Sequence, residues 1–416
     1  MFYFCIKIVY VVINILNMQR QRNKFRRFFI SSRTWRWFAN VIIPFAVMFT
    51  GFALEKHYGN SRSEKVVPES RDTEMVTVAP TTPADINISL QQKLDSVVET
   101  PVSTVVRKNF RGRWKRLKDF PGQRRYMAFV FAIAGKAYMG TGARGDIFFP
   151  DFWEYDPGKD EWTRKENFPG ERRRGSFSFV INDKGYVGGG NGFLKDVDNY
   201  PDTFTKDFWE YNPKENKWRK RKYLPVDYSY SSAVTFVING KGYVVTGTDD
   251  GDYEKYRKLY EYDPETDTWT RKKDFPGKKR SDAFGFALNN KGYVGCGSYS
   301  YYTTYSDFWE YDPVTDSWTQ KNDFPVKCDD ALAVVINGKA YVGFGKSYIE
   351  QKSNYYSGFW EYNPDKDCWN TTASFIGDKR HNIFLFSIGN KAYIGLGYRV
   401  DNTWRYFRDM WEFTPN

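Results

Sequence analysis

Large and small apolar side chains alternate along the chain with a period of two residues. Phe129 and Phe131 alternate with Ala128 and Val130. The same spacing recurs at Phe177/Phe179, Phe284/Phe286 and Phe384/Phe386. A period of two places successive side chains on opposite faces of a β-strand. We therefore predict short strands packed sheet on sheet, which in the first unit cover about 126–133, 136–142, 150–156 and 161–166.

These strands belong to a unit of about 50 residues that recurs from Trp114 to the C-terminus, a period typical of propellers. One landmark is Lys-(Gly/Ala)-Tyr, which starts at 136, 184, 241, 291, 339 and 391. A glycine stands four residues after each of these tyrosines, at 142, 190, 247, 297, 345 and 397. A second landmark is Tyr, six residues, then Trp, as in Tyr155/Trp162. Pro and Asp or Asn between the two rings supply turn chemistry.

The repeated unit resembles the kelch repeat over about 300 residues from Arg113 to the C-terminus. One departure is that most copies read Gly-x-Gly after the second strand, as at 140–142, where the family usually has adjacent glycines. The resemblance implies an all-β fold, a six-bladed kelch propeller with one four-stranded blade per unit. We place this domain at 109–416.

The two ends of the repeated region predict how the ring closes. The last unit stops after its third strand, where Phe413 takes the tyrosine position and no Trp follows. Near the start, Trp114 lacks a preceding Tyr. We therefore expect the strand around Trp114 to complete the sixth blade, which removes an exposed strand edge.

The N-terminal part of the chain reads as an export or anchor segment. Residues 38–54 are apolar and uncharged, and basic residues precede them, an order typical of a signal or signal-anchor. We assign 1–54 to this signal-anchor region and 55–108, rich in Ser, Thr, Val, Pro and Glu, to a disordered tether. The positive-inside rule then places the propeller outside the cytoplasm, with membrane contact through 38–54.

The charge distribution argues against nucleic acid as a partner. The net charge is +12, but residues 1–54 hold eight Lys or Arg and no acid, so the rest of the chain has an excess of only four. A phosphate-binding patch would be expected on the folded domain. The basic excess is better explained by membrane topology.

Composition and symmetry limit the chemistry. Aromatic residues make up 19% of the chain, which favours strands, and four Cys exclude a disulfide-stapled miniprotein. Copper chemistry of the galactose oxidase type needs two histidines, and His381 alone lies in the repeats. No zinc cluster is present, and 249–252 (DDGD) is an incomplete calcium loop, so we expect no metal or cofactor. A glutamate recurs in all six WEY-type strands, as at Glu154, and we interpret these as structural.

Aromatic residues gather in the variable loops between second and third strands. These loops share one rim of a kelch-type propeller with the blade-to-blade loops, and function is expected where the copies differ. Tyrosine and tryptophan suit contacts with sugars or proteins; the alternative is that the rings pack the loops together. The candidates are Tyr301, Tyr302, Tyr305, Tyr355, Tyr356, Trp404 and Tyr406.

A second asymmetric set lies thirteen residues before each repeated tyrosine. It comprises Arg125, Arg173, Tyr230, Arg280, Cys328 and Arg380, and the residues that follow include Arg174, Asp329 and His381. In kelch domains of ubiquitin-ligase adaptors, arginines at the matching position receive carboxylates. The resemblance therefore implies an anion pocket of Arg125, Arg173, Arg280 and Arg380. The alternative is that nearby acids such as Asp282 or Asp330 satisfy them.

Three functions remain open. The first is a membrane-tethered binding module that presents an Arg/Tyr-rich rim to a glycan or a protein. The second is a sugar mutarotase or related isomerase, because exported sialic-acid mutarotases are six-bladed kelch proteins and ring opening needs only a proton donor and acceptor. The third is a structural envelope protein with an inert rim, which would tolerate Arg280→Glu.

Overall fold

The structure is a computed structural model that describes residues 112–192, 203–226, 230–248, 255–300, 302–349, 352–401 and 403–416. The expectations for 1–54 and 55–108, for Tyr301 and for the 249–252 loop lie outside these residues. In the described part of the chain, no helix is long and apolar enough to cross a bilayer.

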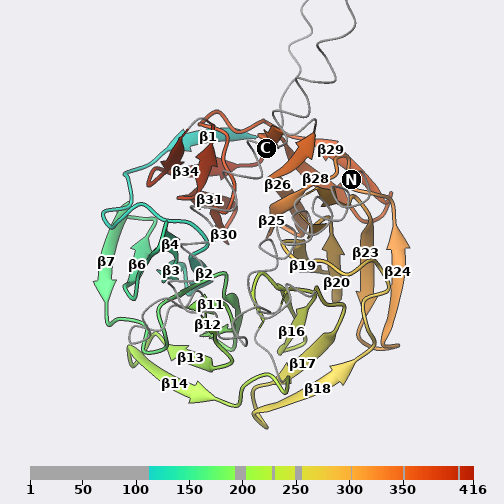
Figure 1. Ribbon diagram of the computed structural model, residues 1–416, viewed down its shortest axis with the longest axis horizontal. Helices are drawn as coiled ribbons and strands as arrows, with labels where there is room; N and C mark the ends of the chain where they lie inside the picture. The colour runs from blue at the N-terminus through green and yellow to red at the C-terminus, as the bar shows by residue number, and fades with distance from the viewer. Residues whose placement is uncertain are drawn as a thin grey trace, which may run out of the picture. The chain divides into compact units, whose positions relative to one another are not determined.

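Six antiparallel sheets form the blades of a propeller, as the repeats predicted (Figure 1). In each sheet the innermost strand is named first and the outermost last. Blade 1 is β2 (Phe129–Ile133), β3 (Lys136–Gly140), β6 (Phe152–Asp156) and β7 (Glu161–Lys165). Blade 2 is β9 (Phe177–Ile181), β10 (Lys184–Gly188), β13 (Phe208–Asn212) and β14 (Lys217–Arg221). Blade 3 is β15 (Val234–Ile238), β16 (Lys241–Val245), β17 (Leu259–Asp263) and β18 (Thr268–Lys272).

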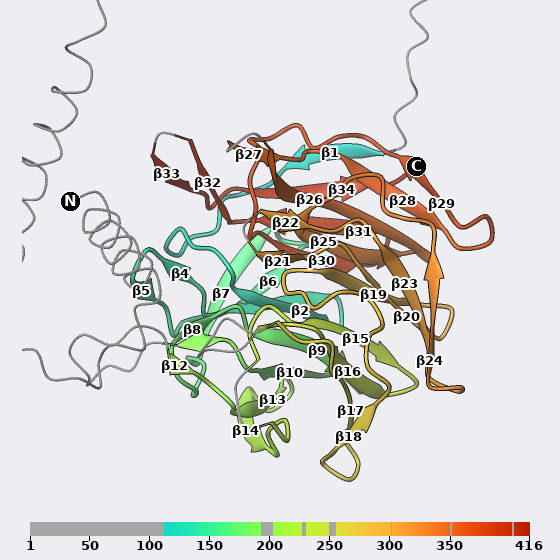
Figure 2. The same cartoon turned by 45° about the vertical axis from the view of Figure 1, so that its right-hand side comes forward.

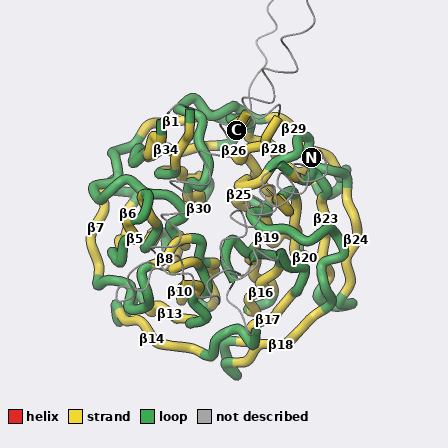
Figure 3. Tube along the Cα trace, viewed as in Figure 1, coloured by secondary structure: helices red, strands yellow, loops and turns green. Residues whose placement is uncertain are grey.

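The remaining blades repeat the same order. Blade 4 is β19 (Phe284–Leu288), β20 (Lys291–Gly295), β23 (Phe308–Asp312) and β24 (Ser317–Lys321). Blade 5 is β25 (Asp329–Ile336), β26 (Lys339–Ile349), β28 (Phe359–Asn363) and β29 (Cys368–Thr371). Blade 6 is β30 (Phe384–Ile388), β31 (Lys391–Gly395), β34 (Met410–Thr414) and β1 (Arg113–Arg116). Figure 3 shows strands and loops but no helix in the described residues.

Strand β1 is the outer strand of blade 6, although it comes from the opposite end of the described chain. It pairs antiparallel with β34, with Trp114 opposite Phe413. The Trp114 ring packs against Phe413, Phe359 and Phe375, with centroid distances of 4.9, 5.7 and 5.1 Å. Its indole N–H donates to the carbonyl of Ala373 in blade 5. The first strand therefore joins the last sheet and also packs on its neighbour.

Aromatic rings fill the seams between blades, and small residues make room for them. A Cβ on Gly185 of blade 2 would lie 2.3 Å from the Phe131 ring of blade 1. Gly242 and Gly292 have the same relation to Phe179 and Phe236. This close approach explains the Gly or Ala in every Lys-(Gly/Ala)-Tyr landmark, because a larger side chain would push the sheets apart.

The recurrent glutamates bind within their own sheets, as predicted. Glu210 is buried and accepts hydrogen bonds from Tyr186 and Arg221, and Lys184 pairs with it at 3.0 Å. Tyrosine hydroxyls also donate to Glu261, Glu310 and Glu361. Burial raises the pKa of Glu210, but its Lys184 and Arg221 partners lower it further, so the net pKa falls below its ordinary value. These carboxylates are therefore satisfied structural groups.

One residue per blade forms a ring of backbone hydrogen bonds around the propeller axis. We call these six residues the axial ring: Met127, Gly175, Ser232, Asp282, Asp330 and Asn382. Five links are made from N–H to carbonyl between neighbouring members, at 2.9 to 3.2 Å. All six have a positive φ, between 53° and 67°. In blade 1 the left-handed residue Met127 interrupts the strand pairing, so β2 begins at Phe129 and not at 126 as predicted. In blade 5 the strand β25 continues past Asp330 to Asp329.

The loops between second and third strands carry small hairpins on one face of the propeller. Figure 2 shows β4, β5, β12, β32 and β33 on the same side of the blades. In blade 5, β26 continues past its sheet and pairs with β27. These strands are β4 (Ala143–Arg144), β5 (Ile147–Phe148), β11 (Asn191–Gly192), β12 (Thr203–Phe204), β21 (Ser298–Ser300), β22 (Thr303–Thr304), β27 (Lys352–Tyr355), β32 (Tyr398–Val400) and β33 (Trp404–Tyr406). The short strand β8 (Arg173–Arg174) precedes β9 and pairs with β11.

Truncation of Trp114 tests the contribution of β1. Trp114→Ala should lower the free energy of unfolding by about 3 kcal/mol, because it removes a large ring from the blade 5–6 seam. Trp404→Ala, which removes an exposed ring, should change it by less than about 0.5 kcal/mol. Urea denaturation followed by circular dichroism measures both. Equal stability of the two variants would show that β1 adds little to the ring.

Candidate functional site

The four predicted arginines lie in the interior, each in the same clasp. Arg173 is fully buried, and its two Nη atoms pair with the two carboxylate oxygens of Asp207. Its Nε donates to the Glu171 carbonyl at 2.8 Å, and Nη1 donates to the Gly189 carbonyl at 3.1 Å. The Trp209 indole also donates to Asp207. The same carbonyl and carboxylate contacts hold Arg125, Arg280 and Arg380, which pair with Asp151, Asp307 and Asp409.

The predicted anion pocket of Arg125, Arg173, Arg280 and Arg380 is therefore corrected. Each guanidinium already donates hydrogen bonds to both oxygens of a carboxylate and to two backbone carbonyls, and all four side chains are buried. A ligand carboxylate would have to displace a paired acid inside the protein. From the sequence we also considered that nearby acids pair with the arginines. This alternative is correct, but the acids are not Asp282 and Asp330. Because Arg280 is buried, the variant Arg280→Glu would report on the stability of the core and would not test the hypothesis of an inert rim.

The partner acids carry a signal that the sequence reasoning missed. An Asp precedes the Phe-Trp or Met-Trp pair in the third strand of the four blades that have the arginine. Blades 3 and 5 lack both members: Tyr230 and Cys328 replace the arginine, and Lys258 and Gly358 replace the aspartate. Two positions about 30 residues apart that change together within one chain indicate a contact. Comparing blades pairwise would have found the clasp.

A different set of charges meets beside the axis, between blades 5 and 6. We call Asp329, Asp330, Lys346 and His381 the inner cluster. Lys346 forms ion pairs with both Asp330 and, at 3.3 Å, Asp329. Nδ1 of His381 lies 2.9 Å from Asp330 Oδ2. All four side chains are at most 16% exposed, and a buried cluster of this kind occurs at one seam only among the described residues.

Burial and mutual repulsion separate the pKa values of the two acids. Burial and the Asp330 charge raise the pKa of Asp329 to about 7. Asp330 has the opposite shift: burial raises its pKa, but Lys346 and His381 lower it to well below its ordinary value. Burial lowers the pKa of His381 in spite of Asp330. Near neutral pH, the cluster thus holds a charged Asp330–Lys346 pair, a neutral imidazole and an Asp329 that titrates.

A cavity of about 580 Å³ opens next to the inner cluster, a volume typical of small-molecule sites. The β26–β27 and β32–β33 hairpins form its walls. Its lining residues are Lys346, Tyr348, Lys352, Ser353, Tyr355, His381, Tyr398, Val400, Asp401 and Trp404. Lys346 and His381 therefore connect the buried charges with the open space.

The two hairpins are fastened to each other across the cavity. The Tyr355 hydroxyl donates to the Val400 carbonyl at 3.2 Å and accepts from the Val400 N–H at 3.0 Å. Trp404 stacks on Tyr398 at 4.9 Å and is 58% exposed. The Tyr398 ring in turn lies 4.2 Å from the His381 ring. The cavity thus has an aromatic wall with one exposed indole and polar groups at its base.

The structure brings only some of the predicted site residues together. His381, Tyr355 and Trp404 line the cavity, and Asp329 joins it through Lys346. Arg174 lies over the rings of Tyr126 and Phe148, at 5.5 and 5.3 Å. Tyr302 is exposed but packs on Tyr348, at 4.9 Å.

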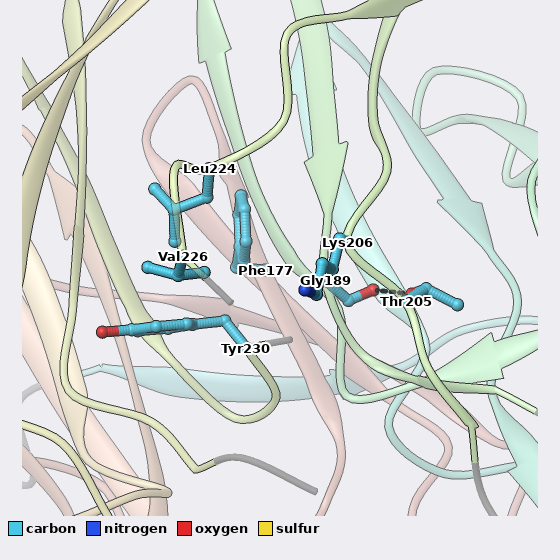
Figure 4. Close-up of a pocket in the computed structure, with 7 residues that line it drawn as sticks. All are labelled: Phe177, Gly189, Thr205, Lys206, Leu224, Val226 and Tyr230. Carbon is cyan, nitrogen blue, oxygen red and sulfur yellow. Dashed lines mark hydrogen bonds between the residues drawn. The ribbon is translucent and has the colours of Figure 1, made fainter. Parts of the chain in front are cut away.

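Three other predicted tyrosines pack inside the fold. The Tyr305 ring covers the Arg280 guanidinium at 4.5 Å, and the Tyr356 hydroxyl bonds to Ser347. Tyr230 is buried and stacks on Tyr256 at 5.6 Å. Figure 4 shows Tyr230 with Val226 and Leu224 around a void of about 10 Å³, too small for a ligand other than about one water.

Lys346, Lys352 and Tyr398 are site residues that the sequence analysis did not select, and Asp330 was considered there only as a possible partner of the arginines. Lys346 follows the repeated glycine of blade 5, and this position pairs with Asp329 across the ladder. Opposite charges at paired repeat positions occur in blade 5 alone among the described blades. This difference between the blades is visible in the sequence only when the strand register is known.

Comparisons with known proteins support the fold and no more. No family model matches the chain, and no curated relative matches. A solved structure entitled "Structure of YjhT" superposes with a TM-score of 0.62 over 72% of this chain and 97% of that one, at 19% identity. The chain is thus similar to YjhT in architecture, as a six-bladed propeller, while the kelch assignment stays a resemblance.

Loss of one clasp should destabilise the fold in a pH-dependent way. Arg173→Met should cost about 3–5 kcal/mol of unfolding free energy at pH 7, because Asp207 stays buried without its cation. Arg173 lowers the pKa of Asp207 against the effect of burial. A carboxyl group whose pKa is lower in the folded state than in the unfolded state stabilises the fold at a pH above the unfolded pKa. This stabilisation is lost as the pH falls through the folded-state pKa.

The wild type should therefore lose stability below about pH 4, and Arg173→Met should lose less over the same range. Urea denaturation at pH 7 and pH 3 measures this, with exposed Arg172→Met as the control. If Arg173→Met and Arg172→Met are equally stable at pH 7, the clasp is not structural.

Proposed function

We propose that the propeller binds a carboxylated sugar in the cavity between the β26–β27 and β32–β33 hairpins. The observation that carries this proposal is the exposed Trp404 ring beside two lysines in a cavity of about 580 Å³. An indole face suits the C–H face of a sugar ring, and its rigidity limits the entropy lost on binding. The volume suits a ligand of one or two sugar rings.

The cations of the cavity differ in their availability. Lys346 is neutralised by Asp329 and Asp330, so its ammonium has little charge left for a ligand. Lys352 is exposed on β27 and lines the same cavity. We therefore assign the ligand carboxylate to Lys352 and the ligand hydroxyls to His381, Ser353 and the Lys346 ammonium.

The proposal includes the cellular setting that the sequence suggests. The propeller lies outside the cytoplasm and is tethered through residues 38–54, so that the hairpin face is presented to extracellular glycans. N-terminal sequencing of the mature protein and protease treatment of intact cells test this part. A propeller that stays protected after the outer envelope is permeabilised, and is cut only when the cytoplasmic membrane is lysed, contradicts it.

Binding should depend on the exposed indole and on Lys352. Calorimetric titration of the full chain with N-acetylneuraminate and glucuronate should show binding. Trp404→Ala and Lys352→Ala should each weaken it at least about tenfold, through lost stacking and lost charge. The matched control is Tyr223→Ala, which removes an aromatic ring that is 58% exposed outside the cavity.

The neutral analogues N-acetylglucosamine and glucose should bind more weakly than the acids, and the difference should vanish in Lys352→Ala. Binding of an acidic peptide but of no sugar would replace the glycan by a protein partner. Unchanged affinity in Trp404→Ala would overturn the assignment to this cavity.

The inner cluster favours a second candidate, a sugar mutarotase. Opening a sugar ring at the anomeric carbon needs a base for the anomeric hydroxyl and an acid for the ring oxygen. His381 lines the cavity and its pKa is lowered, so the imidazole is free to accept a proton. Asp329, with a pKa of about 7, still carries a proton in part near neutrality. Binding ranks first because Asp329 does not itself line the cavity.

Anomer exchange separates the two candidates. If the protein is a mutarotase, NMR exchange spectroscopy of N-acetylneuraminate should show acceleration that His381→Gln abolishes. The rate should fall at a pH below the ordinary titration range of histidine, because burial lowers the pKa of His381 and protonation removes the base. Asp365→Asn, an exposed change in a distant turn, should have no effect. Interconversion at the buffer rate removes the enzyme candidate and leaves binding untouched.

A further inference from the structure

Two cysteines from adjacent blades meet inside the propeller. Cys296 follows β20 of blade 4, and Cys328 directly precedes β25 of blade 5. Their Sγ atoms lie 3.3 Å apart, and both residues are fully buried in one core cluster. Although 32 positions separate them in the sequence, the sulfur atoms are in van der Waals contact.

Backbone bonds hold both cysteines in place. The Gly297 N–H donates to the Cys328 carbonyl at 2.8 Å, which links blade 4 to blade 5. Arg280 donates to the Cys296 carbonyl at 2.7 Å. The backbones that carry the two sulfurs are therefore held in place, and rotation of the cysteine side chains changes the distance between the sulfurs.

Comparison of the blades shows that cysteine is peculiar to this seam. The position of Cys328 is Arg in four blades and Tyr in blade 3. The position of Cys296 is Thr, Gly, Thr, Phe and Leu in the other five. Blade 5 has lost its arginine–aspartate clasp, since Cys328 and Gly358 occupy the two positions. Cys328 thus occupies a clasp position of the blade that lacks the clasp, and its sulfur meets a cysteine of the neighbouring blade.

We propose that Cys296 and Cys328 form a disulfide that joins blade 4 to blade 5. A bond of about 2.05 Å requires the sulfurs to approach by little more than 1 Å, roughly the scale of a side-chain rotation. The cross-link takes over part of the role that the clasp has in blades 1, 2, 4 and 6. It does not depend on any ligand of the hairpin face.

The oxidant is a disulfide, either glutathione disulfide or that of a thiol–disulfide oxidoreductase. One cysteine thiolate attacks it, forms a mixed disulfide and releases one thiol. The second thiolate attacks the mixed disulfide, closes the Cys296–Cys328 bond and releases a second thiol. The two cysteines are oxidised, the oxidant disulfide is reduced, and the two cysteine protons end on the released thiols.

Burial sets the time at which this reaction takes place. Neither sulfur is exposed in the folded propeller, and the contact with Cys296 together with burial raises the pKa of the Cys328 thiol. A buried neutral thiol reacts slowly. The bond therefore forms while blades 4 and 5 are still open, and the closed ring then shields it from reductants.

Refolding of the full chain in two redox buffers tests the proposal. The reduced, denatured protein is refolded in glutathione with its disulfide, or in dithiothreitol, then denatured, alkylated and digested with trypsin. The oxidised sample should contain a linked pair of peptides, 292–321 and 328–339. Its thermal midpoint should exceed that of the reduced sample by several degrees.

Single variants supply the controls. Cys328→Ser should match the reduced wild type in both buffers, whereas Cys368→Ser, at a half-buried position of β29, should keep the linked peptides. Alkylation of both Cys296 and Cys328 after oxidative refolding to the native state would overturn the proposal. A Cys368 cross-link in their place would overturn it too. If Cys328→Ser does not fold, the alkylation pattern of the wild type still decides.

Discussion

The hydrogen-bonded axial ring is the constraint that the rest of the propeller depends on. Each member needs a left-handed backbone so that its N–H and carbonyl can bond around the axis. In five of the six blades the innermost strand begins two residues after its member of the ring, whereas β25 of blade 5 begins at Asp329, one residue before Asp330. The backbone has nearly sixfold symmetry, but the side chains of the ring do not. Met127 has an apolar side chain and Gly175 has none, whereas the side chains of Asp282, Asp330 and Asn382 are polar.

The blades show how one fold uses different forces at equivalent places. Four blades bury an arginine against an aspartate of the same blade, which is acceptable because the guanidinium finds a carboxylate and two carbonyls as acceptors. In blade 3 the buried Tyr230 stacks on Tyr256 instead. In blade 5, Cys328 and Gly358 occupy the clasp positions, the Cys328 sulfur meets that of Cys296, and Asp329 and Asp330 pair with Lys346. The exceptions, and not the repeats, hold the unusual chemistry.

The proposed site follows from this break in symmetry. The blade 5 and blade 6 hairpins rise from the face that carries the inner cluster, and Tyr355 ties them together. The cavity therefore has rigid walls, an aromatic surface and titrating groups at its base. The other candidate arginines contribute to packing, because their donors are bonded within the protein, and Tyr305 covers one of them with its ring. A ligand site needs groups with unused capacity, and among the predicted residues these are concentrated near His381 and Trp404.

The sequence by itself determined the architecture. Period-two alternation, six Lys-(Gly/Ala)-Tyr landmarks and the structural role of Glu210 all follow from local patterns, since strand faces and turns depend on neighbouring residues. Only the tertiary structure decided the site. Strand register brings together residues that are far apart in the sequence, such as Arg173 with Asp207 and Asp329 with Lys346. These contacts then determine whether a charged group is already paired within the protein or is available to a ligand. Side-chain type shows what a residue is able to bind, whereas its neighbours in space determine what it still has available.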